Sequence, residues 1–268
     1  MLKRLLPTAL ALAFWFIPLQ AFAQGFANDY SDIWYLPSES GWGVNMVQSQ
    51  NFIFATFFVY GSGNQPTWYT AQMLSDANGN FAGTLYSTVG TYLGEPWVAN
   101  NLVTTAAGTA SFVPTSAYQG TLTYSINNGP TVVKSIQRQS LTTIALGGSY
   151  LGGIEGGYAN SGGTCPDAGG YTDTYNLTVS QPGDGTASFT FSFASGNPAT
   201  CTLSGTLVQH GQLYSIPSAS YQCSDGLSTS ASMDQIKATA QGVEGTYFAP
   251  AVGSNCSEAA TFSAVFLQ

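Results

Sequence analysis

The sequence predicts an all-β protein made of two antiparallel meander domains, each an up-and-down barrel or a sandwich. Short runs of alternating aromatic, β-branched and polar residues recur along the chain, and Gly, Asn and Pro turn signals separate them. A helical pattern is found only at Met233–Gln241. Meanders of seven or eight short strands usually close on themselves, because closure removes the strand edges that would otherwise pair between molecules.

The first 23 residues, 1–23, are typical of a secretory signal peptide. Lys3 and Arg4 form a basic start, Leu5–Leu19 forms an apolar core, and Ala21-Phe22-Ala23 supplies the small residues of a cleavage site. The apolar run is shorter than the roughly 20 residues that span a bilayer, and no later run is longer. We therefore expect an exported protein, periplasmic or extracellular, without a transmembrane helix.

The mature chain divides into two domains, 25–146 and 147–268. Four of the five Trp lie in the first range and all four Cys lie in the second. The glycine pair Gly147-Gly148 separates the last strand of one from the first strand of the other, and each range has the size of an ordinary domain. We expect an aromatic-rich, barrel-like β domain followed by a disulfide-containing β domain.

Turn signals at Gly61–Asn64, Asn78-Gly79 and Asn127–Gly129 set the order of strands in the first domain. The strands are expected at Trp42–Ser49, Phe52–Tyr60, Thr67–Leu74, Phe81–Val89, Gly108–Pro114, Gly120–Ile126 and Thr131–Gln139. Most of them alternate between apolar and polar residues, whereas Phe52–Tyr60 reads FIFATFFVY and is apolar on both faces. This pattern predicts that its outer face is covered by the second domain, by another subunit or by lipid.

The four cysteines, in a chain addressed to an oxidising compartment, predict two disulfides. The segment between Cys201 and Cys223 has His210-Gly211 near its midpoint, so a hairpin that turns there brings these two cysteines opposite each other. Cys165 and Cys256 then form the second pair. His210, with no acid or nucleophile beside it in the sequence, is expected to be a solvated turn residue.

Composition limits the function classes. Charged residues make up 7% of the chain. After loss of Lys3 and Arg4, three basic residues face 13 acidic ones, so the mature net charge is −10. Nucleic-acid binding is excluded because it requires a basic footprint. An uncharged, aromatic-rich surface suits a neutral glycan or a small amphipathic ligand.

No metal or cofactor is expected. Asp76–Asn80 begins like a calcium-binding loop, but Phe81 occupies the position of the required Gly and Ser87 that of the bidentate Glu. The segment is better explained as a hairpin turn.

The stretch Trp34–Met73, with its ESGWG and FATFFVYG…PTWY motifs and the later K-x-I-x-R of Lys134, Ile136 and Arg138, resembles a module of exported Gram-negative bacterial proteins that has no established activity. Trp34-Tyr35 and the GTLYSTVG segment at Gly83–Gly90 also resemble strand sequences of avidin-type barrels, which belong to the calycin group. That resemblance implies the barrel architecture. It does not extend to biotin binding, because Leu36 stands where avidins carry Asn.

We identify no catalytic residue from the sequence, and the preferred function is a non-enzymatic exported module that binds a neutral ligand or serves at the cell surface. Its candidate ligand-binding residues are Trp42, Trp68 and Glu39, since Glu39 lies in a loop between aromatic residues. The alternative is a secreted carbohydrate-active hydrolase that uses Glu39 with a second acid. A hydrolase needs two convergent carboxylates, whereas a binding module needs none.

Overall fold

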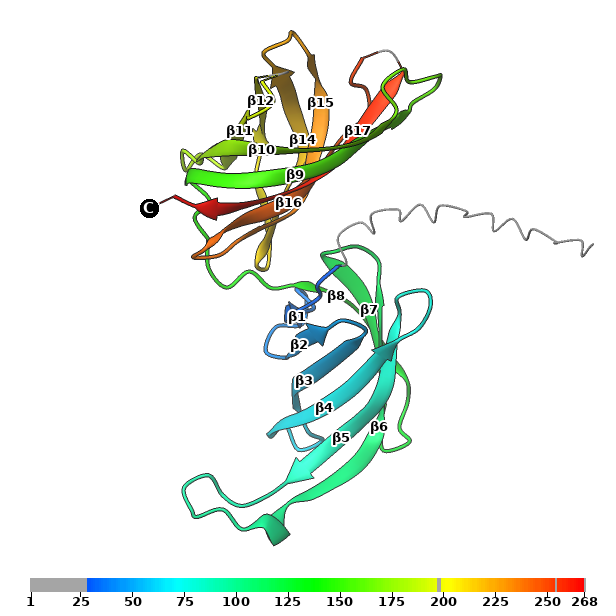
Figure 1. The fold of residues 1–268 in the computed structure, drawn as a ribbon. Coiled ribbons are helices and arrows are strands. Elements are labelled where there is room, and N and C mark those ends of the chain that lie inside the picture. The colour runs from blue at the N-terminus through cyan, green and yellow to red at the C-terminus, as the bar shows by residue number, and fades with distance from the viewer. Residues whose placement is uncertain (1–27, 197–198, 254, 268) are drawn as a thin grey trace, which may run out of the picture.

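The computed structural model describes residues 28–196, 199–253 and 255–267, which form two antiparallel β units joined by a short linker (Figure 1). The predicted signal peptide lies outside these residues. The eight strands of the first unit are β1 (Asp32–Tyr35), β2 (Gly43–Ser49), β3 (Phe52–Tyr60), β4 (Pro66–Ser75), β5 (Phe81–Val89), β6 (Val103–Pro114), β7 (Gln119–Ile126) and β8 (Val132–Arg138). They follow one another in chain order around a closed barrel, and β1 pairs with β8 to complete it.

The second unit contains nine strands. They are β9 (Gly148–Asn160), β10 (Gly169–Ser180), β11 (Thr186–Phe193), β12 (Thr200–Thr206), β13 (Val208–His210), β14 (Leu213–Cys223), β15 (Ser228–Ala238), β16 (Gly242–Ala249) and β17 (Cys256–Phe266). Pairing of β12 with β14 joins the two ends of the sheet into a ring of eight strands, with β13 added along β14. We call β1–β8 the first barrel and β9–β17 the second barrel. The predicted all-β fold of two antiparallel meanders is confirmed.

Helical structure in the described residues is limited to η1 (Ala99–Asn101), a single 3₁₀ turn. No helix in this part of the chain is long and apolar enough to cross a membrane. The helical pattern at Met233–Gln241 was misleading, because β15 occupies most of that range. A bulge near Gln235, whose φ is +50°, shifts the register and places Met233 and Ile236 on the buried face with helical spacing.

Side chains fill the first barrel. Trp34 is completely buried and meets the edge of the Phe112 ring at 5.0 Å between centroids, while Tyr30 contacts both of these rings. The guanidinium of Arg138 lies over the Trp34 ring, 5.1 Å from its centroid. These residues close the end of the barrel that faces the second barrel.

The outer face of β3 is open, which corrects the prediction that the second domain covers it. Ile53, Ala55 and Phe57 point into the barrel, but Phe54 and Phe58 are 39% and 50% exposed on the outside. Alternation is preserved, as expected for a barrel strand. The sequence was ambiguous because large apolar residues occupy both faces.

The two barrels are joined by hydrogen bonds, one of them to the carboxylate of a buried ion pair within the first barrel. Arg138 Nη1 lies 3.1 Å from Asp32 Oδ2, and both residues are at least 95% buried. The same carboxylate oxygen accepts a hydrogen bond from the backbone N–H of Gln212 in the β13–β14 turn at 3.0 Å. Ser140 Oγ in the linker accepts one from Gly211 N–H at 3.1 Å. The β13–β14 turn of the second barrel is therefore hydrogen-bonded directly to the first barrel and to the linker.

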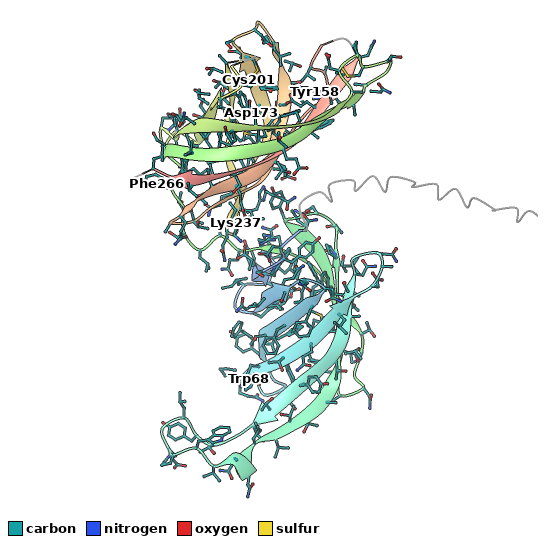
Figure 2. All side chains as sticks on the ribbon, viewed as in Figure 1. Trp68, Tyr158, Asp173, Cys201, Lys237 and Phe266 are labelled. Atoms are coloured by element: carbon teal, nitrogen blue, oxygen red, sulfur yellow. A yellow bond between two sulfur atoms is a disulfide. The ribbon has the colours of Figure 1, made fainter. Side chains whose placement is uncertain are left out.

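Both disulfides lie at the end of the second barrel away from the first (Figure 2). Cys201 and Cys223 are register partners on β12 and β14, as the hairpin argument predicted, and Cys165 is bonded to Cys256.

Inside the second barrel, near the disulfides, Glu258 is 3% exposed and accepts hydrogen bonds from three tyrosine hydroxyls. Tyr171 donates at 2.5 Å, Tyr247 at 2.8 Å and Tyr221 at 3.1 Å. The ring of Tyr171 lies directly over Gly156, where a Cβ would come within 2.6 Å of its hydroxyl. The cluster satisfies both oxygens of a buried carboxylate and fills this part of the barrel.

Candidate functional site

The first barrel has one mouth that faces away from the second barrel. Because neighbouring strands run in opposite directions, the β1–β2, β3–β4, β5–β6 and β7–β8 connections all gather at this end (Figure 1). The linker and the second barrel contact the opposite end. We call the first of these ends the free mouth, and it contains two of the three predicted site residues.

The ESGWG motif shapes the β1–β2 connection at the free mouth. Its turn is closed by the N–H of Glu39, which donates to the carbonyl oxygen of Leu36 at 2.9 Å. Gly41 has φ +104°, a conformation that favours glycine, and a Cβ on Gly43 would lie only 3.1 Å from the carbonyl oxygen of Trp34. The two glycines thus let the chain turn sharply and bring Glu39 beside Trp42.

Glu39 is held between an indole and an ammonium group. Trp42 Nε1–H donates to Glu39 Oε2 at 3.2 Å, and Lys134 Nζ donates to both carboxylate oxygens at 2.7 Å. The hydrogen bonds from Lys134 lower the pKa of the Glu39 carboxyl, and the carboxylate in turn raises the pKa of Lys134. The side chain of Glu39 is 43% exposed and that of Lys134 is 22% exposed. The pair is therefore charged, mutually neutralised and open to water.

Aromatic and aliphatic side chains cover the barrel core at the free mouth. Trp42, Tyr69 and Tyr124 are half-buried and pack on the barrel core together with Val59 and Ile126. Tyr124 meets the buried Phe57 edge-on at 6.1 Å between centroids, and burial raises the pKa of its hydroxyl. The free mouth therefore combines ring surfaces with a donor and an acceptor group at its rim.

Trp68 does not join this group. It lies on β4 opposite Phe58, on the outer face of the barrel, and is 49% exposed (Figure 2). Its neighbour Tyr69 points toward the interior, on the same face of β4 as the buried Ala71 and Met73. The structure thus brings Glu39 and Trp42 together and separates Trp68 from them by the thickness of the sheet.

Sequence reasoning missed Lys134 and Tyr124 as members of the site. Lys134 lies 95 residues from Glu39, and only barrel closure through β8 brings the two together. One signal was present in the K-x-I-x-R motif, whose period of two places Lys134 on the same inner face as Ile136 and Arg138. A lysine whose side chain points inward is expected to pair with an acidic side chain at the same end of the barrel.

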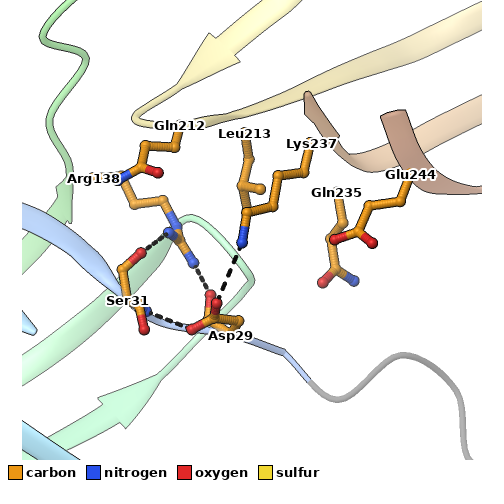
Figure 3. A pocket seen from close by; sticks show the side chains of 8 residues that line it. All are labelled: Asp29, Ser31, Arg138, Gln212, Leu213, Gln235, Lys237 and Glu244. Carbon is orange, nitrogen blue, oxygen red and sulfur yellow. Dashed lines mark hydrogen bonds and ion pairs between the residues drawn. The ribbon is translucent and has the colours of Figure 1, made fainter. Parts of the chain in front are cut away.

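A second candidate lies between the two barrels (Figure 3). There Lys237 Nζ is 3.5 Å from Asp29 Oδ2, and Arg138 donates to the backbone carbonyl of Asp29. The residues that line this cavity are Asp29, Ser31, Arg138, Gln212, Leu213, Gln235, Lys237 and Glu244. Its volume of about 70 Å³ is far below the roughly 300 Å³ of small-molecule sites, so water fits it better than a ligand.

The described residues contain no group of three or more His, Cys, Asp or Glu side chains that could hold a metal ion. No protein-family model matches the chain, and no curated protein matches it. One similar solved structure is the crystal structure of "a putative outer membrane protein" from Bacteroides fragilis NCTC 9343. The two are 10% identical over 87% of this chain and 94% of the other, with a TM-score of 0.32. A TM-score this low supports no inference from that protein to this one.

Proposed function

We propose that this protein is an exported, non-enzymatic β module that binds a neutral, hydroxyl-bearing ligand, a glycan in the first instance, at the free mouth of its first barrel. The observation that carries the proposal is the group formed by Trp42, Glu39 and Lys134, supported from below by Tyr124. A paired carboxylate and ammonium offer an acceptor and a donor at neighbouring positions. Ring faces beside them offer an apolar platform.

The chemistry suits a neutral ligand because the site neutralises itself. Lys134 already pairs with Glu39, so neither group has a free charge with which to hold an ion. Sugar hydroxyls donate and accept hydrogen bonds, and can be shared by both partners of an exposed ion pair. Salt should then have little effect on binding, because the ligand carries no charge to be screened.

The electrostatics of Glu39 argue against a hydrolase. A general acid must hold a proton near neutral pH, which requires a raised pKa, whereas Lys134 lowers the pKa of Glu39. An acid–base pair also needs a second carboxylate about 5–10 Å away. The contacts of Glu39 are instead with Trp42 and Lys134.

Export is consistent with this function. The four cysteines are paired in two disulfides, which suits an oxidising compartment, periplasmic or extracellular. A surface made of uncharged hydrogen-bonding groups is suited to binding neutral polymers outside the cytoplasm.

An array of neutral glycans tests the proposal, followed by titration calorimetry on any glycan that binds. Trp42→Phe keeps most of the side-chain volume but removes the N–H that orients Glu39, and Lys134→Met removes the ammonium. We expect each variant to weaken binding about tenfold or more, which is the loss of one well-placed hydrogen bond to a charged group.

Trp68→Phe is the matched control, since Trp68 lies on the outer face of the same barrel. It should bind as the wild type does. Absence of any neutral glycan ligand, equal losses in Trp42→Phe and Trp68→Phe, or binding that collapses with added salt would each contradict the proposed site.

A further inference from the structure

The first barrel carries an uncovered apolar surface on its outer face. We call it the outer apolar wall, and its large side chains are all at least 39% exposed. They are Val47 on β2, Phe54, Phe58 and Tyr60 on β3, and Trp68 and Leu74 on β4. The outward residues Asn45, Thr56 and Thr70 form a polar row between Phe54 and Phe58. Monomeric proteins rarely expose so many large apolar side chains on three neighbouring strands, so the wall indicates a contact surface.

A second uncovered apolar element projects from the same barrel. We call residues 90–102, between β5 and β6, the arm, which extends away from the barrel in Figure 1. Its large apolar side chains face solvent, and Leu93 at its tip is 98% exposed. The others are Tyr92, Trp97, Val98 and Leu102, with exposures of 74%, 64%, 47% and 49%.

The arm is a structured element. Thr91 Oγ1 accepts a hydrogen bond from Val98 N–H at 3.0 Å and donates to the carbonyl oxygen of the same residue at 3.1 Å, which ties the two sides together. The N–H of Glu95 donates to the carbonyl oxygen of Tyr92 at 3.0 Å and forms the turn at the tip. An arm held in one shape presents its apolar side chains at little entropic cost on binding.

The distribution of charge limits where two copies of this chain can meet. Strands β2–β7 contain no Asp, Glu, Lys or Arg, and the arm contains one charged side chain, Glu95. The chain as a whole has a formal net charge of −8. Two such acidic molecules repel each other wherever their carboxylates come close, so copies of this chain can approach best through the uncharged side of the first barrel.

We infer that the protein forms a two-fold homodimer in which the arm of each copy packs on the outer apolar wall of the other. Under a two-fold axis each contact occurs twice, so one arm and one wall per chain bury both apolar surfaces of both copies. The contact goes beyond ligand binding, and involves neither Trp42 nor Glu39.

Light scattering after size-exclusion chromatography tests the dimer on the full exported chain with its disulfides intact. We expect twice the mass of one chain for the wild type at micromolar concentration. Leu93→Asp on the arm and Phe58→Ser on the wall should each weaken dimerisation about 100-fold or more, since each change acts at two symmetric sites. Circular dichroism confirms that each variant is folded.

Val133→Asp is the matched control, because Val133 is 62% exposed on β8, outside both surfaces. It should remain dimeric. A photoreactive benzoylphenylalanine at position 93 should join isotopically labelled to unlabelled chains through peptides of β3 or β4, and the same group at position 133 should not.

Several results would overturn the inference. These are a wild-type chain that elutes as a monomer, a dimer unaffected by Leu93→Asp or by Phe58→Ser, and cross-links from position 93 to any other surface. Binding of a monomeric chain to phosphatidylcholine vesicles, lost in the same two variants, would assign both surfaces to a bilayer and overturn it as well.

Discussion

The ring of Tyr118 in the β6–β7 connection stacks on the imidazole of His210 in β13, with centroids 4.0 Å apart and planes inclined by 19°. Tyr118 belongs to the first barrel and His210 to the second. The Tyr118 hydroxyl also donates to Asp234 and accepts a hydrogen bond from Gln235 N–H at 2.9 Å. His210 is therefore a half-buried residue of the junction, which corrects its prediction as a solvated turn residue.

This stacking predicts a pH-dependent stability. Burial lowers the pKa of His210 from its ordinary 6.5, and Arg138 acts in the same direction, although the charge of Asp234 opposes them. Below pH 6.5 the unfolded chain then binds a proton more readily than the folded chain, so the free energy of unfolding falls as the pH drops through that value.

Urea unfolding at pH 7.5, 6.5 and 5.5 measures the effect. His210→Gln should flatten the loss of stability over this range, because it removes the group whose pKa differs between the two states. An unchanged pH profile in this variant would show that carboxylates account for the whole dependence.

The buried pair Arg138–Asp32 predicts a large effect of removing one partner. Arg138→Met leaves the Asp32 carboxylate buried without its cation, and we expect a loss of about 3–5 kcal/mol in the free energy of unfolding. Lys237→Met, at the exposed pair with Asp29, should cost less than about 1 kcal/mol. Similar losses in the two variants would mean that the junction pair is as solvated as the surface pair.

The disulfides predict two different losses of stability. Cys201–Cys223 closes a sequence separation of 22 residues and Cys165–Cys256 one of 91, so loop entropy predicts about 3 and about 5 kcal/mol respectively. Paired Cys→Ser variants measured in guanidinium unfolding test the order. A larger loss from the shorter loop would show that local packing around β12 and β14 outweighs chain entropy.

The cluster around Glu258 predicts tyrosines that resist ionisation. Burial, followed by the nearby Glu258 charge, raises the pKa of Tyr171 and Tyr221, and burial raises that of Tyr247. In an absorbance titration of the folded protein up to pH ~11, Tyr221→Phe should leave the amplitude unchanged. Tyr92→Phe, at a site 74% exposed, should reduce it by one phenol. Equal reductions would mean that water reaches the cluster.

The sequence predicted local structure well because local structure depends on neighbours in the chain. Phe52–Tyr60 and Phe81–Val89 are strands with the predicted bounds. The Cys201–Cys223 pair also lies within one hairpin that turns near Gly211, although the register shifts by one residue between β13 and β12. In each of these cases the controlling contacts lie within about one hairpin of each other.

Features that depend on distant segments could not be read in the same way. The Glu39–Lys134 pair needs the closure of the whole barrel, and the Tyr118–His210 stack needs both barrels in place. The orientation of Phe57 and Phe58 was hidden because both faces of β3 are apolar. The bulge near Gln235 imitated a helical period, since one extra residue changes the spacing of buried positions.

The position of the disulfides also determines how the chain would respond to a mechanical load. β17 ends at Phe266, at the end of the second barrel near the linker. Cys256 begins the same strand at the opposite end, where the disulfides lie. A pull on the C-terminus therefore separates β17 from β9 and β16 together, beginning at Phe266 and stopping at Cys256. From there the covalent link to Cys165 transfers the force to the connection between β9 and β10, and the rest of the second barrel bears the load as a unit.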